Sequence, residues 1–208
     1  ITPISSLAST AGELLPQSPN EAMDEDDLET MQQALSTISR RSKGLLNFVE
    51  VYRDLTRIPQ PNFKPVTVKD LLFGAKLMLL HKSKRKHLDI KIQTSPDNIS
   101  ITADASLLEQ VLLNLLINAL HAVKDTLQPK ILMSSRINQN DRVIIEIADN
   151  GCGIKPELMD KIFMPFFTSK EKGSGIGLSL SRQIIHLHKG NLFVKSVYGK
   201  GTVFTIVL

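Results

Sequence analysis

The chain has 208 residues, enough for one substantial domain and a smaller one, and its hydrophobic content of 42% and charged content of 22% are those of an ordinary globular protein. Its net charge of +4 is mild, and because the basic run at 81–87 has no interleaved aromatic residues and tryptophan is absent, we expect no nucleic-acid partner. No apolar run approaches the roughly 20 residues of a membrane span, and a single cysteine, Cys152, favours a reducing, cytoplasmic compartment. Any membrane contact is therefore expected from segments outside this chain.

The N-terminal quarter predicts two antiparallel helices. The second carries a heptad seam, which consists of Leu28, Met31, Leu35, Ile38, Ser42, Leu45, Val49 and Tyr52. The same spacing occurs over residues 1–15, and the intervening PQSPNEAMDED predicts a loop that runs into an acidic first helical turn. One helical hairpin cannot enclose a core. We therefore expect residues 1–58 to form a homodimer through helices 1–15 and 25–57, as a four-helix bundle.

The prolines of RIPQPNFKP, residues 57–65, end the second helix and predict a linker. Beyond it, helical and alternating segments interleave. Helices are expected at 68–84, 104–125 (with Asp104 as N-cap), 155–163 and 177–188, and strands at 88–95, 98–103, 129–138, 142–149 and twice within 190–208. Strands mixed with helices that can cover one face predict an α+β fold, a two-layer α/β sandwich over residues 64–208.

Two amides lie on the apolar helix at 104–125. Asn114 and Asn118 are four residues apart and project from one face, where they cost desolvation energy unless something pairs with them. One interpretation is a hydrogen bond to a neighbouring helix. The other is a set of oxygen ligands for a phosphate-bound Mg²⁺, which prefers such hard donors. His121 shares the face and could reach a phosphate.

The stretch DNGCGI, residues 149–154, follows an alternating apolar strand. Asn-Gly is a common hairpin turn signal, but a hairpin would be followed at once by another strand. Here KPELMDKIF follows, which predicts a short helix. The carboxylate of Asp149 and the two glycines therefore need another explanation.

A glycine run, GSGIGL, begins at Gly173 and leads into a helix. Glycines let backbone approach an anion closely, and a helix start supplies unpaired N–H groups and a positive dipole end. The run is not a P-loop, since no Gly-Lys-Ser/Thr follows, and it lacks the preceding strand of a dinucleotide fingerprint. The preceding FMPFFTSKEK suits a movable lid that carries Lys170 towards phosphates.

Together, the paired asparagines, DNGCGI, FMPFFTSK, GSGIGL and the closing GKGTVFTIVL resemble, in order and spacing, the motifs of sensor histidine kinases. The resemblance covers residues 64–208, and ITPI followed by a helical hairpin is similar to the dimerisation and phosphotransfer region of that family. It implies the Bergerat fold of gyrase-type and histidine kinase ATPases, with ATP and Mg²⁺ as ligands. The homodimer would pass a phosphoryl group to a response-regulator receiver domain.

The resemblance also implies roles for individual residues. Asp149 would accept the adenine amino hydrogen, and the catalytic group would be Asn114, Asn118, His121 and Lys170, with Asn118 and Asn114 as metal ligands. The ATP or ADP site would be lined by Asn118, Asp149, Gly151, Gly153, Ile154, Phe163, Thr168, Ser169, Lys170, Gly173, Ser174, Gly175, Ile176, Gly177, Leu178 and Thr202.

Two departures refine the expected activity. Related ATPases of this fold place a water-activating glutamate where this chain has Asn114, so slow hydrolysis and transfer to a better nucleophile are expected. The family's phosphoacceptor histidine would fall upstream of Ile1, and none of the five histidines lies on the hairpin, so this chain is not expected to phosphorylate itself. The alternatives are a clamping ATPase of the same fold, a protein-serine kinase of that fold, and a non-catalytic scaffold.

Overall fold

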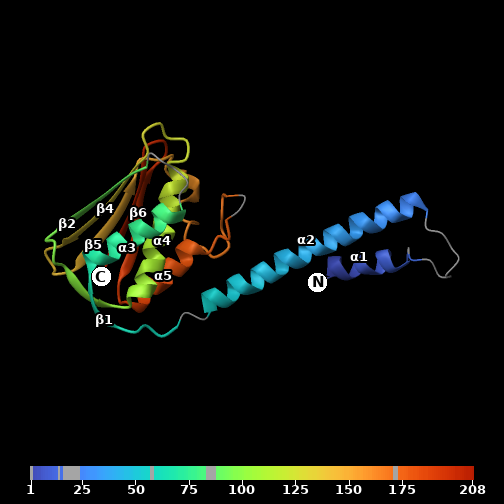
Figure 1. Cartoon of the computed structure of the whole chain (residues 1–208), viewed down its shortest axis with the longest axis horizontal. Helices are drawn as coiled ribbons and strands as arrows, with labels where there is room; N and C mark the ends of the chain where they lie inside the picture. The colour runs from blue at the N-terminus through green and yellow to red at the C-terminus, as the bar shows by residue number, and fades with distance from the viewer. Residues whose placement is uncertain (1, 14, 16–23, 57–58, 83–87, 171–172) are drawn as a thin grey trace. The chain divides into compact units, whose positions relative to one another are not determined.

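The computed structural model describes residues 2–13, 15, 24–56, 59–82, 88–170 and 173–208. The chain divides into two compact units, Ile1–Arg57 and Ile58–Leu208, each of which is described by itself (Figure 1). Part of the predicted linker, at 57–58, and most of the basic run, at 83–87, lie outside the described residues.

The first unit is a helical hairpin of α1 (Thr2–Glu13) and α2 (Glu25–Thr56). The two helices pack through small side chains, since Ala11 and Ala34 are buried. Of the predicted seam on α2, α1 covers only part: Leu28, Leu35 and Leu45 remain 45%, 53% and 47% exposed. The hairpin by itself therefore leaves an apolar stripe exposed.

The second unit has one five-stranded sheet with the order β2-β4-β5-β7-β6. Its strands are β2 (Asp89–Ser95), β4 (Lys130–Ile137), β5 (Val143–Asp149), β6 (Asn191–Val197) and β7 (Gly201–Val207). β2 and β4 run parallel, and the other neighbours are antiparallel. The helices α3 (Val68–Lys82), α4 (Ala105–Ala122) and α5 (Gly177–Leu187) lie on one side of this sheet (Figure 1). The predicted two-layer α+β sandwich is confirmed.

Helix α4 is the centre of the core. Val111, Leu112, Leu115 and Leu116 are almost fully buried, and α4 contacts α3, α5, β5 and β7. Alternation along the strands supplies the other half of the core, because every second side chain of β4 and β5 points to the helices. By length and composition α4 could also cross a membrane, the one such helix among the described residues, although the sequence alone predicted no candidate. Here it packs as the core helix of the unit.

Two predicted elements differ from the structure. The linker prediction missed β1 (Lys64–Thr67), which pairs antiparallel with β3 (Ser100–Ala103) in a separate two-stranded sheet. That pairing joins segments far apart in the sequence, so no local periodicity reveals it. The helix predicted at 155–163 is a single 3₁₀ turn, Pro156–Leu158, followed by turns, because the segment is too short and too exposed to propagate an α-helix.

Candidate functional site

The carboxyl end of β5 presents Asp149 opposite the buried Thr202 of β7. Asp149 Oδ1 accepts a hydrogen bond from the backbone N–H of Gly151 over 2.9 Å. Burial nevertheless raises the pKa of Asp149, and the backbone donors of Gly151 and Thr202 offset that effect only in part. The carboxylate is therefore desolvated but short of donors, with capacity to accept from a ligand.

The glycine loop after Asp149 is docked on the end of α4. The N–H of Cys152 donates to the carbonyl of Ala122 over 3.0 Å. A side chain at Gly151 would place its Cβ 2.5 Å from the same carbonyl oxygen, so only glycine fits. Gly153 has φ of +68° and passes against the backbone of Val197. These contacts fix the loop between α4 and the β6–β7 end of the sheet.

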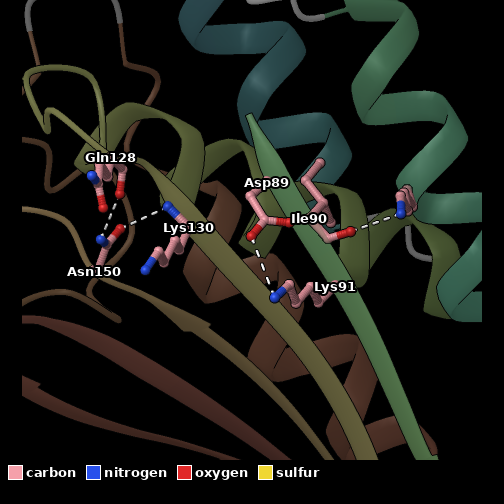
Figure 2. Close-up of polar contacts among 7 residues, drawn as sticks. Asp89, Ile90, Lys91, Gln128, Lys130 and Asn150 are labelled. Carbon is pink, nitrogen blue, oxygen red and sulfur yellow. Dashed lines mark hydrogen bonds and ion pairs between the residues drawn. The ribbon is translucent and has the colours of Figure 1, made fainter. Parts of the chain in front are cut away.

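Asn150 explains why Asn-Gly does not make a hairpin here. Its Oδ1 accepts from the backbone N–H of Lys130 and its Nδ2 donates to the carbonyl of Gln128, each over 2.8 Å. Figure 2 shows the Asn150 side chain bridging to this segment at the start of β4. The asparagine thus fastens the end of β5 to the beginning of the neighbouring strand and leaves Asp149 free for the site.

Ser196 is a site residue that the sequence did not single out. Its Oγ accepts from the N–H of Ile154 over 2.8 Å, lies 2.9 Å from Thr202 Oγ1, and donates to the carbonyl of Gly201 over 3.0 Å. One hydroxyl thereby holds the glycine loop, the last strand and the β6–β7 turn together. A serine at an inward position of the alternating strand β6 is the only sequence signal that could have indicated it.

The two asparagines of α4 face different partners. Asn114 Nδ2 donates to Ser181 Oγ of α5 over 2.9 Å, and a side chain at Gly177 would overlap the Asn114 amide. This is the helix-to-helix hydrogen bond that the sequence left open as an alternative. Both ends of the Asn114 amide thus meet α5, and the predicted roles of Asn114 in metal ligation and catalysis stay predictions.

Asn118, one turn further along α4, faces the lid instead. Its Oδ1 accepts from Lys170 Nζ over 2.7 Å, and the same nitrogen lies 3.2 Å from His121 Nδ1. Burial, then the charges of Lys170 and Lys124, lower the pKa of His121, so its neutral form is favoured. Desolvation also lowers the pKa of Lys170. The structure thus brings together three of the four residues predicted to act on phosphate.

Short-range contacts hold the described lid residues on either side of 171–172. Thr168 Oγ1 accepts from the N–H of Lys170 over 3.1 Å, and the N–H of Gly173 donates to the carbonyl of Lys170 over 3.2 Å. Gly175 has φ of +71° and packs on the backbone of Phe166.

The remaining predicted nucleotide-site positions divide by exposure. Ser169 and Ser174 are exposed, whereas Ile176 is buried and precedes the first residue of α5. Partly buried side chains that pack on the core are those of Ile154, Phe163 and Leu178.

The residues present fit a phosphate-bound cation. Asn118 Oδ1 already accepts from an ammonium group, which stands in for a cation at that oxygen. The described part of the chain has no cluster of three His, Cys, Asp or Glu side chains that could cage a metal by itself. A Mg²⁺ ion held mainly by phosphate and water, with one amide oxygen, suits that donor set. Two surface hollows, about 400 and 550 Å³, are lined by neither Asp149 nor Asn118.

Comparison with known proteins agrees with this geometry. Residues 103–208 match the family described as histidine kinase-, DNA gyrase B-, and HSP90-like ATPase. The chain is 33% identical over 171 residues to the sensor histidine kinase ZraS of Salmonella typhi, covering 82% of this chain and 36% of ZraS. It is 33% identical over 177 residues to the histidine-protein kinase AtoS of Escherichia coli K12, covering 85% of this chain and 29% of AtoS.

Solved structures show the same fold. The catalytic domain of histidine kinase ThkA is 30% identical, with a TM-score of 0.63, over 71% of this chain and 95% of that domain. A second structure, ThkA in complex with the response regulator protein TrrA, has a TM-score of 0.66 at 24% identity, over 99% of this chain and 57% of that one.

The chain belongs to the histidine kinase-, DNA gyrase B- and HSP90-like ATPase family. Its resemblance to the sensor histidine kinases is confirmed by relatives of that kind. The second unit therefore holds an ATPase domain of this family, and it is similar to those of sensor histidine kinases. The chain spans about a third of the length of these curated relatives.

Proposed function

We propose that this chain binds Mg·ATP between Asp149 and Asn118 and, within a longer protein, transfers the γ-phosphoryl group to a histidine for relay to a response-regulator aspartate. The observation that carries the proposal is the desolvated carboxylate of Asp149, whose pKa is raised by burial. It lies at one end of a glycine loop that docks on α4, the helix that presents Asn118 to a cation.

Asp149 would select the base. A carboxylate that accepts hydrogen bonds favours the amino group of adenine over the carbonyl that guanine has at the same position. Ser196 would keep Ile154 and Thr202 in place beside it, because one hydroxyl bonds to both. Adenine preference would then follow from a loop that is positioned before any ligand arrives.

The phosphate end would use Asn118 as the metal ligand, with Lys170 and His121 near the terminal phosphate. Mg²⁺, when bound, would neutralise charge on the phosphate oxygens. Asn114 is hydrogen-bonded to Ser181 and carries no basic group, so water would not be deprotonated from that position. Positioning for a nucleophile stronger than water would set the outcome.

The acceptor would not be a histidine of this chain. His81, His121 and His186 lie on α3, α4 and α5, and His188 directly follows α5. None of the described histidines lies on the hairpin. A histidine outside these 208 residues would serve instead, as the family resemblance implies.

The hairpin would supply the homodimer. The exposed stripe of Leu28, Leu35 and Leu45 needs a second helical hairpin to cover it, and a four-helix bundle does so. The ThkA structure with TrrA supports a response regulator as the partner of such a chain. We propose that this phosphotransfer takes place in the cytoplasm.

Calorimetric titration with ATP and GTP, each with Mg²⁺, and incubation with γ-labelled ATP test the proposal. We expect binding of ATP over GTP, no label on the 208-residue chain, and acid-labile label when the chain is extended to include an acceptor histidine. Absence of ATP binding would refute the nucleotide site. Acid-labile label on the present chain would make His121 the first suspect as acceptor, and acid-stable label would favour a serine kinase.

A further inference from the structure

Lys170 of the lid is tethered to α4 by two side chains. Its Nζ donates to Asn118 Oδ1 over 2.7 Å and lies 3.2 Å from His121 Nδ1. The partners are 52 and 49 residues away in the sequence, so no local turn imposes the contact. We propose that the Lys170 ammonium occupies the cation position on Asn118 until a Mg²⁺-nucleotide displaces it, so that metal binding and release of the lid are one exchange. This inference rests on the proposed nucleotide site.

The exchange follows from the chemistry of the amide oxygen. Asn118 Oδ1 is a neutral oxygen donor that suits both an ammonium group and a hard divalent cation. Two cations within a hydrogen-bond length of each other repel, even where the site is open to solvent. The ammonium and the metal therefore compete for Asn118, and His121 Nδ1 gives the ammonium a second acceptor while the metal is absent.

Contacts within the lid determine where the Lys170 backbone stands. Thr168 Oγ1 accepts from its N–H, and the N–H of Gly173 donates to its carbonyl. A Cβ at Gly173 would approach Thr168 Oγ1 to 2.5 Å, so a side chain there would displace the hydroxyl that accepts from Lys170. Because the N–H and the carbonyl of Lys170 are bonded to Thr168 and Gly173, a tether at its Nζ also restrains these two residues.

The tether has a consequence for nucleotide affinity. When no metal is present, Lys170 can stay on Asn118 and supply the positive charge that the phosphates need. When Mg²⁺ arrives with the nucleotide, that charge is supplied twice and Lys170 must leave Asn118. Loss of Lys170 should therefore weaken binding of metal-free nucleotide more than binding of the Mg²⁺ form.

Hydrogen exchange of the nucleotide-free chain tests the tether itself. In Lys170→Met we expect the backbone amides of residues 166–170 to exchange several-fold faster than in the wild type. Lys161→Met, at an exposed lysine nine positions earlier, is the matched control and should leave them unchanged. Asn118→Asp should slow them, because a carboxylate pairs with an ammonium more strongly than an amide does. Equal exchange in Lys170→Met and wild type would overturn the tether.

Titration with ADP tests whether Mg²⁺ displaces Lys170 from Asn118. The affinity for ADP is measured with Mg²⁺ and with a chelator, for wild type and for Lys170→Met. For each protein, the affinity with Mg²⁺ is divided by the affinity with the chelator, and the two ratios are compared. We expect this ratio to be about 10-fold larger in the variant, the effect of one hydrogen bond to a charged group. If both proteins bind ADP and the ratio is the same in both, only the displacement of Lys170 by Mg²⁺ is overturned. Failure of the wild type to bind ADP under both conditions would overturn the proposed function. Hydrogen exchange of the nucleotide-free chain would still test the tether.

Discussion

Two aspartates of the second unit occupy opposite electrostatic environments. Asp104 begins α4, where its Oδ1 accepts from Ser106 Oγ over 2.7 Å and from the N–H of Leu107 over 3.1 Å. Its Oδ2 accepts from the N–H of Asn62 over 2.8 Å. These donors, that of Asn62 first, lower the pKa of Asp104 to about 2.

Asp149, at the end of β5, has the reverse balance. Burial raises its pKa, and the backbone N–H of Gly151 and a backbone hydrogen bond of Thr202 offset that effect only in part. The two carboxylates therefore serve different purposes. Asp104 is satisfied by the protein and stabilises the fold, whereas Asp149 costs the fold free energy and keeps acceptor capacity for a ligand.

The largest expected effect is that of Asp149→Asn on nucleotide affinity. Loss of a hydrogen bond to a charged acceptor costs roughly 1.5–3 kcal/mol, or about 10- to 150-fold in the dissociation constant. Because a partly desolvated charge is removed, the free energy of unfolding should stay the same or rise. Calorimetric titration and urea unfolding measure the two quantities. Glu146→Gln, on the same strand, is the control, and unchanged affinity in Asp149→Asn would contradict the comparison.

Asp104→Ala should show the opposite pattern. Loss of the N-cap and of the bond to Asn62 should lower the free energy of unfolding by about 2 kcal/mol, with no change in nucleotide affinity. Asp97→Ala, which removes an exposed pair with Lys69 and a hydrogen bond from Thr94 Oγ1, should cost clearly less than Asp104→Ala does. Unfolding in urea checks both variants. If Asp97→Ala proved as costly as Asp104→Ala, the assigned role of the cap would be wrong.

Acid should act on the two carboxylates in opposite senses. Since the pKa of Asp104 falls from 3.8 to about 2 on folding, its stabilising contribution is present above 3.8 and is lost as pH falls towards 2. Since the pKa of Asp149 is raised, its contribution to the free energy of unfolding is lost as pH rises through its pKa in the folded chain. On acidification, Asp149 is protonated before ordinary aspartates are, so nucleotide affinity should fall first. Carboxyl chemical shifts followed by NMR against pH would show the order: Asp149 protonates before Asp104.

A smaller effect should separate the two asparagines of α4. Ser181→Ala leaves the Nδ2 of Asn114 without its partner, so the free energy of unfolding should fall by about 1 kcal/mol. Nucleotide affinity should change less than about twofold, because Asn118 is untouched. Urea unfolding and calorimetric titration measure these two quantities. A tenfold loss of affinity in Ser181→Ala would return Asn114 to the nucleotide site.

The sequence by itself determined much of this unit. The alternation of β4 and β5, the apolar face of α4 and the cap at Asp104 are local patterns, and each appears in the structure where it was expected. Local patterns suffice there because burial on one face of a helix or strand follows from its own period. The glycine motifs also indicated the nucleotide-binding family, which the comparisons show.

Only the tertiary structure decided which polar groups meet. Asn114 and Asn118 are equivalent in the sequence, yet one bonds to Ser181, 67 residues away, and the other to Lys170, 52 residues away. The Ser196 hydroxyl and the β1–β3 pair likewise join segments that no local period relates. The physical reason is that the type of a side chain determines whether it donates or accepts a hydrogen bond, but not with which residue. The packing of elements that are distant in the sequence selects the partner.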